Sequence, residues 1–480
     1  FFFFFKQKTA YEIHERLVGS AVGLGNIWGF PNKMGANGGF PFLILYLALA
    51  LCCGVIIMLG ELALGRKTGH GAVGAYQSIS KRFKWLGWLG IAAAALIFSF
   101  YSALGGYCLR YVVVNFGNLI GAEFGTNGVG GADVFQGLLS QPDVSIAFAL
   151  AFMFITMLVV MSGVGGGIER VCSVGMPALF FILIICIIRS CTLPGAADGL
   201  KYMFVPGWAV ANGIIDEAPG FWRVLTAAGG QMFFSLSLGA GVMITYGSYL
   251  DKKQDLGKST MIIVGMDTVV ALMAGLCVIP GRFALDPNGA LGGPELLFIT
   301  MQNVFDKMGP AGPVFGILFY LLVFFAAISS SISMLEVIVA HFCDKAREKG
   351  KGDRRKLYSA IAVVICAALC ALVCADGMGS NHISPAELLG LAGAKLPGWS
   401  TSWLGLFDSV AEGLLMPLGA LLMCLMISWE LKPDALRQEI LLNGENRPWV
   451  YDFFRLCVKY ITPLCMLMIL YGQISDFFIV

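Results

Sequence analysis

Long apolar segments separated by short polar stretches follow one another along almost the whole chain. A helix needs about 20 residues to cross the hydrocarbon core of a bilayer, and most of these segments reach that length. We expect eleven such helices, over residues 14–35, 38–64, 85–116, 145–162, 172–191, 221–249, 259–280, 312–340, 357–375, 402–429 and 450–473. The pattern therefore predicts an all-α membrane protein.

Two of these segments are interrupted by a glycine-rich run. The runs are Gly19-Ser-Ala-Val-Gly-Leu-Gly-Asn26 and Ser235-Leu-Ser-Leu-Gly-Ala-Gly241. Glycines that interrupt a membrane helix free backbone groups that lipid cannot satisfy, so such a break persists where it lines a polar cavity. Paired breaks in the two halves of a chain are typical of a transporter with a binding site at the membrane midplane.

Charged residues in the loops predict how the helices are oriented. The stretch 66–84 carries five Lys and Arg residues and no acid, whereas the loop 117–144 carries three acids and no base. Basic loops stay in the cytoplasm, so the first helix begins inside and the eleventh ends outside. This predicts a 5+5 inverted repeat with unwound helices 1 and 6, plus one extra helix. The repeats would cover residues 14–191 and 192–429, and the extra helix would lie in 430–480.

Composition supports the membrane class and narrows the chemistry. Hydrophobic residues make up 58% of the chain and charged residues 13%, whereas soluble domains have about 45–50% and 25%. The net charge of +2 and the absence of a long basic cluster give no reason to expect a nucleic-acid partner. The 14 cysteines lie mostly in apolar stretches without His partners, which favours small buried hydrophobic residues over metal ligands.

The first 13 residues do not fit this pattern. Phe1 to Phe5, followed by Lys6-Gln-Lys-Thr-Ala-Tyr-Glu-Ile13, resembles the translation of a sequencing-adapter oligonucleotide. We therefore interpret residues 1–13 as an artefact of the DNA sequence. Only His14 to Val18 then precede the first break, so we expect part of the first helix to be missing.

Several motifs resemble those of the neurotransmitter:sodium symporters. They are Gly19-Ser-Ala-Val-Gly-Leu-Gly-Asn-Ile-Trp-Gly-Phe-Pro31, Gly60-Glu-Leu-Ala-Leu-Gly-Arg66, Gln231-Met-Phe-Phe-Ser-Leu-Ser-Leu-Gly239, Ile244-Thr-Tyr-Gly-Ser-Tyr249 and Ser329-Ser-Ser-Ile-Ser-Met-Leu-Glu336. The similarity runs in order from about residue 15 to the end, and the aspartate in the seventh helix resembles the bacterial eleven-helix amino-acid transporters. The resemblance implies import of an amino acid by alternating access, coupled to sodium.

The resemblance also implies two sodium sites made of oxygen donors at the breaks. The first would be held by Ala21, Asn26, Ser235 and Asp267, with the substrate carboxylate completing it. The second would be held by Gly19, Val22, Ala326, Ser329 and Ser330. An unwound segment has free backbone carbonyls for a hard cation, and the N-terminal ends of half-helices attract a carboxylate.

The expected substrate site combines residues of helices 1, 3, 6 and 8. By resemblance, these are Ala21, Gly23, Leu24, Gly25, Ile97, Tyr101, Phe234, Ser235, Ser237, Ala240, Ser330 and Met334. The Tyr101 hydroxyl would bind the substrate carboxylate, and Phe234 would cover the pocket. Ala240 stands where leucine-type relatives carry a bulky aromatic residue, and Met334 can adapt to the space. We therefore expect a large hydrophobic or aromatic amino acid.

Acidic residues inside predicted helices include Asp267, Glu61 and Glu336. An intramembrane carboxylate such as Asp267 costs about 2.5–3.5 kcal/mol and usually marks an ion path, the alternative being a structural hydrogen bond. Chloride-dependent relatives have a neutral side chain near this position, so the resemblance implies chloride independence. Glu61 and Glu336 are expected to cap or bridge the broken helices. For the glycine and serine runs, the alternative to a binding role is close packing between helices.

The gates of the family are only partly matched. Gly29 stands where the family has the arginine of its outer gate, although Asp408 stands at the position of the acidic partner. The outer side would then close through Phe234 and Tyr101, or the acid would pair elsewhere. Asp344 matches the acid of the inner gate, whose arginine partner would fall in the excluded N-terminal stretch.

These features predict a sodium-coupled symporter in the plasma membrane of a bacterium or archaeon. Its expected partners are an amino acid, two sodium ions and the lipid bilayer, and the protein would be a monomer or a homodimer. An amino-acid-sensing membrane receptor without transport would keep the same pocket and is the alternative. An enzyme is disfavoured because the sequence has no Ser/His/Asp or metal-binding constellation.

Overall fold

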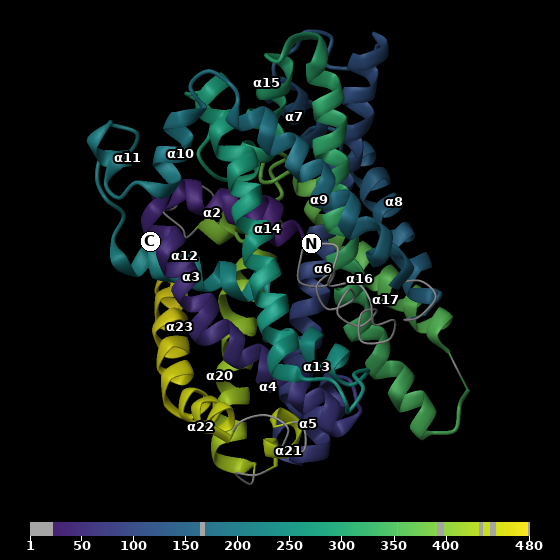
Figure 1. The fold of residues 1–480 in the computed structure, drawn as a ribbon. Coiled ribbons are helices and arrows are strands. Elements are labelled where there is room, and N and C mark those ends of the chain that lie inside the picture. The colour runs from purple at the N-terminus through teal and green to yellow at the C-terminus, as the bar shows by residue number, and fades with distance from the viewer. Residues whose placement is uncertain are drawn as a thin grey trace.

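The computed structural model describes residues 23–163, 169–352, 354–390, 398–431, 435–441 and 448–478. Within these residues every regular element is a helix (Figure 1). The predicted all-α class is therefore confirmed. The expected adapter segment and Gly19, Ala21 and Val22 lie outside the described residues.

The longer helices form the body of the molecule. They are α3 (Phe40–Leu49), α4 (Val55–Thr68), α6 (Lys84–Ile120), α8 (Pro142–Met161), α9 (Glu169–Cys191), α12 (Phe221–Ser235), α14 (Leu256–Leu285), α16 (Gly312–Glu348), α17 (Arg355–Asp376), α20 (Met416–Leu425) and α23 (Thr462–Phe478). Shorter helices are α2 (Phe30–Ala36), α5 (Ala72–Ile79), α7 (Gly131–Leu139), α10 (Ala196–Phe204), α11 (Trp208–Ala211), α13 (Val242–Gly247), α15 (Met301–Asp306), α18 (Pro385–Leu388), α19 (Trp403–Asp408), α21 (Arg437–Ile440) and α22 (Pro448–Leu456).

Several of these helices are joined through wider π-helical segments rather than by loops. Such segments lie at Gly25–Gly29, Ala50–Gly54, Ser409–Leu415, Met426–Glu430 and Cys457–Ile461. A π segment changes the direction of the side chains that follow it and is frequent at functional sites. Three of them, Gly25–Gly29, Ala50–Gly54 and Ser409–Leu415, contact α12.

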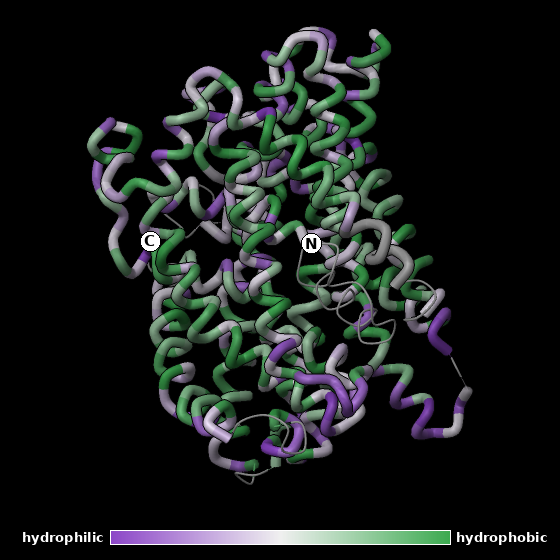
Figure 2. Tube along the Cα trace, viewed as in Figure 1, coloured by the Kyte–Doolittle hydropathy of each residue, from purple (hydrophilic) through white to green (hydrophobic). Residues whose placement is uncertain are grey.

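The membrane-spanning helices can be identified by length and hydropathy. Among the described residues, eight helices are long and apolar enough to cross a membrane, or nine if the pair Pro177–Cys191 and Ala196–Phe204, bent by 110°, counts as one span. The predicted span 221–249 is divided between α12, of 15 residues, and α13, of 6 residues. The count of eleven and the inverted repeat stay predictions. Figure 2 shows hydrophobic residues along the middle of the long helices and hydrophilic residues gathered toward their ends.

The second predicted break is present between α12 and α13. The helix ends at Ser235 and resumes at Val242, and Gly239 between them has φ +77°. A Cβ on Gly239 would lie 2.2 Å from the Met416 carbonyl oxygen, so glycine is needed here for both conformation and space. The Gly239 N–H donates to Glu61 Oε1 at 2.7 Å. Glu61 thus caps the broken helix, as expected from the sequence.

The described part of the first break begins at Gly23. The Asn26 side chain folds back, and its Oδ1 accepts a hydrogen bond of 2.8 Å from the Gly23 N–H. Gln231 Nε2 of α12 donates to the Gly25 carbonyl oxygen at 2.7 Å. The first broken segment therefore lies beside α12, and a side chain of α12 satisfies one of its backbone carbonyls.

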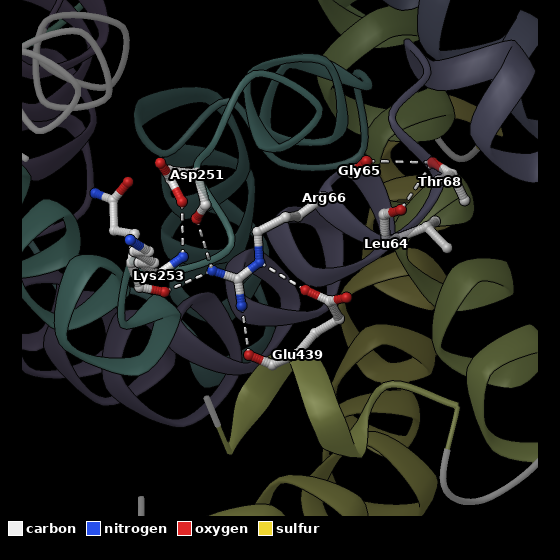
Figure 3. A network of polar contacts seen from close by, with 8 residues as sticks. Leu64, Gly65, Arg66, Thr68, Asp251, Lys253 and Glu439 are labelled. Carbon is white, nitrogen blue, oxygen red and sulfur yellow. Dashed lines mark hydrogen bonds and ion pairs between the residues drawn. The ribbon is translucent and has the colours of Figure 1, made fainter. Parts of the chain in front are cut away.

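Arg66, at the end of α4, ties three segments together (Figure 3). Its guanidinium donates to Glu439 Oε2 at 2.7 Å and to the Glu439 carbonyl oxygen at 2.5 Å. It also donates to the carbonyl oxygens of Gln254 at 2.5 Å and Asp251 at 3.3 Å. Because the planar guanidinium presents several donors in a fixed fork, one side chain holds α4, the segment after α13 and α21 in register.

Candidate functional site

Asn26, Ser235 and Asp267 come together, although 209 and 241 residues separate Asn26 from the other two. Asn26 Nδ2 donates to Ser235 Oγ at 2.9 Å and to Asp267 Oδ1 at 2.7 Å. Ser235 Oγ lies 3.0 Å from both carboxylate oxygens of Asp267. All three residues are buried. Three of the four residues expected at the first sodium site therefore meet at the breaks, and Ala21 lies outside the described residues.

Helix ends and helix faces explain this convergence. Ser235 is the last residue of α12, so its side chain lies at the start of the break. Asn26 lies in the π segment that leads into α2, and Asp267 lies in the middle of α14. The elements pack against one another, since α14 contacts Gly25–Gly29 and α12 contacts the same segment. The polar groups are thus brought into an otherwise apolar core.

Tyr46 is a further member of this cluster that the sequence analysis missed. Its hydroxyl donates to Asp267 Oδ2 at 3.1 Å from α3, and the side chain is fully buried. Tyr46 lies in an apolar span with no local motif, so its polar end carries no signal until α3 packs against α12 and the hydroxyl meets Asp267. The Asp267 carboxylate therefore has partners on three other elements.

The donor set fits a small hard cation. Carboxylate, amide and hydroxyl oxygens are the ligands that hard cations prefer in proteins. Asp267 and Ser235 supply a carboxylate and a hydroxyl oxygen 3.0 Å apart, and the Asn26 amide beside them directs its Nδ2 to both and its Oδ1 to the Gly23 N–H. A fully buried carboxylate also needs a positive partner, because an isolated ionised carboxylate is costly away from water. The described residues therefore suit a sodium ion at this place.

The expected second sodium site is only partly described. Ala326, Ser329 and Ser330 are buried in α16, and Ser329 Oγ lies 2.8 Å from the Ala326 carbonyl oxygen. Gly19 and Val22, the other expected ligands, lie outside the described residues. The structure therefore describes only the ligands of this site that come from α16.

The first break also meets the expected substrate residues of α6 and α12. The Leu24 N–H donates to the Tyr101 hydroxyl at 2.8 Å. The rings of Tyr101 and Phe234 lie 6.2 Å apart between centroids. Gly25 packs closely under Phe234, because a Cβ at Gly25 would lie 3.1 Å from Phe234 Cδ1. Tyr101, Phe234 and the backbone of 23–25 thus form one wall.

The other expected pocket residues are buried, and each lies on a different element. Ile97 in α6, Ser237 in the break and Met334 in α16 are almost inaccessible to solvent. Ala240 lies against the backbone of Gly90, since a Cβ there would lie 3.1 Å from the Ala240 carbonyl carbon. Gly90 precedes Ile97 by about two turns of helix. A role of Ala240, Ile97 and Met334 in the pocket wall stays a prediction.

The expected gate acid Asp344 and the expected structural acid Glu336 have partners in the structure. Asp344 Oδ2 accepts from the Gly71 N–H at 3.0 Å, and Oδ1 lies 3.6 Å from Arg347. Glu336 is a buried acid bound by Arg355, whose guanidinium donates to it at 2.5 and 3.0 Å, and by the Tyr249 hydroxyl at 2.8 Å. These contacts join α16 to neighbouring segments, in agreement with the structural role expected for Glu336.

Gly23→Ala tests the packing of the first break. A Cβ at Gly23 would lie 1.7 Å from Ser330 Oγ and 3.1 Å from the Tyr101 hydroxyl oxygen. We expect the variant to lose about 1–3 kcal/mol of stability by overpacking and to bind ligand poorly. Thermal unfolding and sodium-dependent binding check this. Gly265→Ala on α14, where nothing lies within 4 Å, is the matched control and should behave like wild type; equal behaviour of both variants would contradict the described contact.

Known proteins resemble the chain over almost its full length. A model of the sodium:neurotransmitter symporter family matches residues 5–127 and 133–478. The uncharacterized sodium-dependent transporter YhdH of Bacillus subtilis is 36% identical over 467 residues, 95% of each chain. A sodium-dependent transporter of Methanocaldococcus jannaschii is 30% identical over 444 residues, 88% of this chain and 81% of the relative. The crystal structure of MhsT in complex with L-phenylalanine has a TM-score of 0.82 and 32% identity, covering 98% of this chain and 99% of MhsT. The chain therefore belongs to the sodium:neurotransmitter symporter family, a family of secondary transporters and not of enzymes.

Proposed function

We propose that this protein imports an amino acid by symport with sodium, through alternating access. The observation that carries the proposal is the buried cluster of Asn26, Ser235 and Asp267 at the two broken segments. An uncompensated carboxylate at such a depth is costly, and a bound sodium ion would neutralise it. Coupling follows because a substrate carboxylate placed beside the ion completes the same coordination shell.

The wall formed by Tyr101 and the first break supports an amino acid as substrate. The Tyr101 hydroxyl and the Leu24 N–H at the start of a half-helix, which bond each other here, are suitable donors for a carboxylate. A substrate carboxylate would replace part of the contact between Tyr101 and Leu24. The likeness to MhsT, which was solved with L-phenylalanine, supports a large hydrophobic or aromatic side chain.

Chloride independence is the second part of the proposal. Asp267 supplies a fixed negative charge beside the first sodium ion, so no bound anion is required there. We propose a second sodium ion between the Ala326, Ser329 and Ser330 segment of α16 and the first break. Two monovalent ions moving down about 100 mV would supply about 4.6 kcal/mol.

The architecture belongs to the proposal as well. An eleven-helix, 5+5 inverted repeat would explain why one break precedes α2 and the other precedes α13. The wall residue Phe234 would close the pocket from above, and Asp344 would contribute to the inner closure. Relatives in Bacillus subtilis and Methanocaldococcus jannaschii support the plasma membrane of a prokaryote as the location.

Purified protein in proteoliposomes tests this function. We expect uptake of labelled amino acid that requires an inward sodium gradient, is abolished by potassium replacement, and is unaffected when gluconate replaces chloride. Counterflow of labelled substrate separates a transporter from a receptor, because a receptor binds without exchange across the bilayer. Saturable sodium-dependent binding without counterflow would favour the receptor and overturn the proposal.

Ala240→Phe tests the expected size of the substrate. Ala240 is fully buried beside the backbone of α6, so an added ring takes up space, and overpacking typically costs about 1–3 kcal/mol. We expect sodium-dependent binding of tryptophan to weaken while that of alanine is kept or strengthened. Scintillation proximity binding of tryptophan, leucine and alanine measures this. A parallel loss for all three would mean that the residue acts through the break rather than through pocket size.

A further inference from the structure

The position of the family's outer-gate arginine is filled from a different helix. A Cβ at Gly29 would lie 2.9 Å from Gln231 Oε1, so the Gln231 amide occupies the space beside this glycine. Gln231 is fully buried, its Nε2 donates to the Gly25 carbonyl oxygen, and its Oε1 has no hydrogen-bond partner in the described structure. An arginine at position 29 would displace this amide. The gate must therefore be made elsewhere.

An ion pair lies one helical turn farther along both elements. Lys33, four residues after Gly29, pairs with Glu412, four residues after Asp408. The side chains are only 22% and 7% exposed, so solvent screens the pair weakly. Asp408 precedes Glu412 by four residues in the same continuous helical stretch, so both carboxylates lie on one face of it. Asp408 is therefore a second acid on the face that meets Lys33.

The pair lies on the outer side of the site. Glu412 packs on α12, because a Cβ at Gly230 would lie 2.6 Å from Glu412 Oε1. Gly230 precedes Phe234 by about one turn on the side where α12 begins. Lys33 lies about 10 Å beyond Asn26 along the segment that leads outward. The ion pair thus connects α2 and the π segment Ser409–Leu415, and it lies against α12 about one turn before Phe234.

We infer that Lys33 and Glu412 form the ion pair that closes the outer side of the site, with Asp408 as a second acid on the same face of the helical stretch. This inference rests on the proposed transport function. Breaking the pair leaves one buried charge without its partner, which destabilises the closed form more than the open, solvated one. The loss of Lys33 or Glu412 should therefore favour opening toward the outside. Loss of Asp408 should have a smaller effect, because the main partner of Lys33 remains.

Hydrogen exchange of the purified full chain without substrate tests the closure directly. We expect Lys33→Gln and Glu412→Gln to raise exchange in peptides of α2 and residues 221–230 by about tenfold, with little change in α13. The exchange of charges, Lys33→Glu with Glu412→Lys, should restore slow exchange. It is made together with Asp408→Asn, because a carboxylate at position 33 would otherwise face Asp408. Asp408→Asn alone, and Lys201→Gln at the exposed pair with Asp198, are the controls.

Dissociation of labelled amino acid from the same variants gives the second measurement. We expect Lys33→Gln and Glu412→Gln to release it about tenfold faster than wild type, and the charge exchange to slow release again. Hydrogen exchange that stays at the wild-type rate in both Lys33→Gln and Glu412→Gln would overturn the inference. So would a charge-swapped variant that fails to restore slow hydrogen exchange. Lys33→Arg and Glu412→Asp keep the charges and should keep slow release. They are the controls for a loss of closure that comes from misfolding rather than from the lost ion pair. If the wild-type protein shows no sodium-dependent binding, the proposed function is contradicted. Hydrogen exchange measured without substrate would still test whether Lys33 and Glu412 keep the outer side closed.

Discussion

Asp267→Asn should abolish most of the sodium dependence of ligand binding. The carboxylate accepts hydrogen bonds from Asn26, Ser235 and Tyr46 and is fully buried, so it is the only negative charge of the cluster. The amide keeps the size but loses the charge that would balance a cation. We expect the apparent sodium affinity to fall by at least about tenfold, equivalent to about 1.4 kcal/mol. Sodium titration of labelled amino acid binding measures this change.

Chloride provides a second readout for the same variant. If Asp267 replaces a bound anion, chloride should partly restore sodium-dependent binding to Asp267→Asn and leave the wild type unchanged. Asp286→Asn is a suitable control, because Asp286 caps the end of α14 and lies outside the cluster. An unchanged sodium affinity in Asp267→Asn, together with no response to chloride, would identify the carboxylate as a structural hydrogen-bond acceptor.

Arg66→Gln should cause a large loss of stability. Arg66 is only 4% exposed and donates to the Glu439 carboxylate and to three backbone carbonyl oxygens (Figure 3). Glutamine cannot reach these acceptors from one position, and the removal of one partner of a buried ion pair typically costs about 3–5 kcal/mol. We expect a clear decrease in the unfolding temperature. Thermal unfolding of the purified protein in detergent measures it.

Arg347→Gln is the matched control for this prediction. Arg347 also pairs with a carboxylate, that of Asp344 at 3.6 Å, but its side chain is 82% exposed. Exposed ion pairs contribute about 0–1 kcal/mol, so the unfolding temperature should hardly change. Equal stability of the two variants would show that Arg66 does not hold its three segments together. Arg66→Lys should be intermediate, because lysine keeps the charge but not the planar fork.

Much of the site was predictable because its residues mark local departures from a strong background. In a chain of membrane helices, a glycine-rich run or a carboxylate inside a span is conspicuous. Asn26 and Ser235 belong to the two runs and Asp267 interrupts an apolar helix, so each could be selected from sequence, and the structure brings them together. Their assignment to particular ions came from the resemblance to the family and stays a prediction.

Residues without such a local mark were missed or left open. Tyr46 is one aromatic residue in an apolar span, and only the tertiary packing of α3, which lies against α12, brings its hydroxyl to Asp267. The motif position at Gly29 indicated a missing arginine but not what replaces it. The answer depends on the rotation of α2 and of the π segment Ser409–Leu415, which brings Lys33 to Glu412.

By itself, the sequence determined the helical membrane class, the two breaks and the polar residues at them. These depend on hydropathy, on glycine conformation and on the cost of polar groups in lipid, all of which act over one segment at a time. The tertiary structure decided which side chains meet across segments, such as Arg66 with Glu439 and Lys33 with Glu412. Partners 373 or 379 residues apart are set by helix packing and rotation, which no local pattern in the chain encodes.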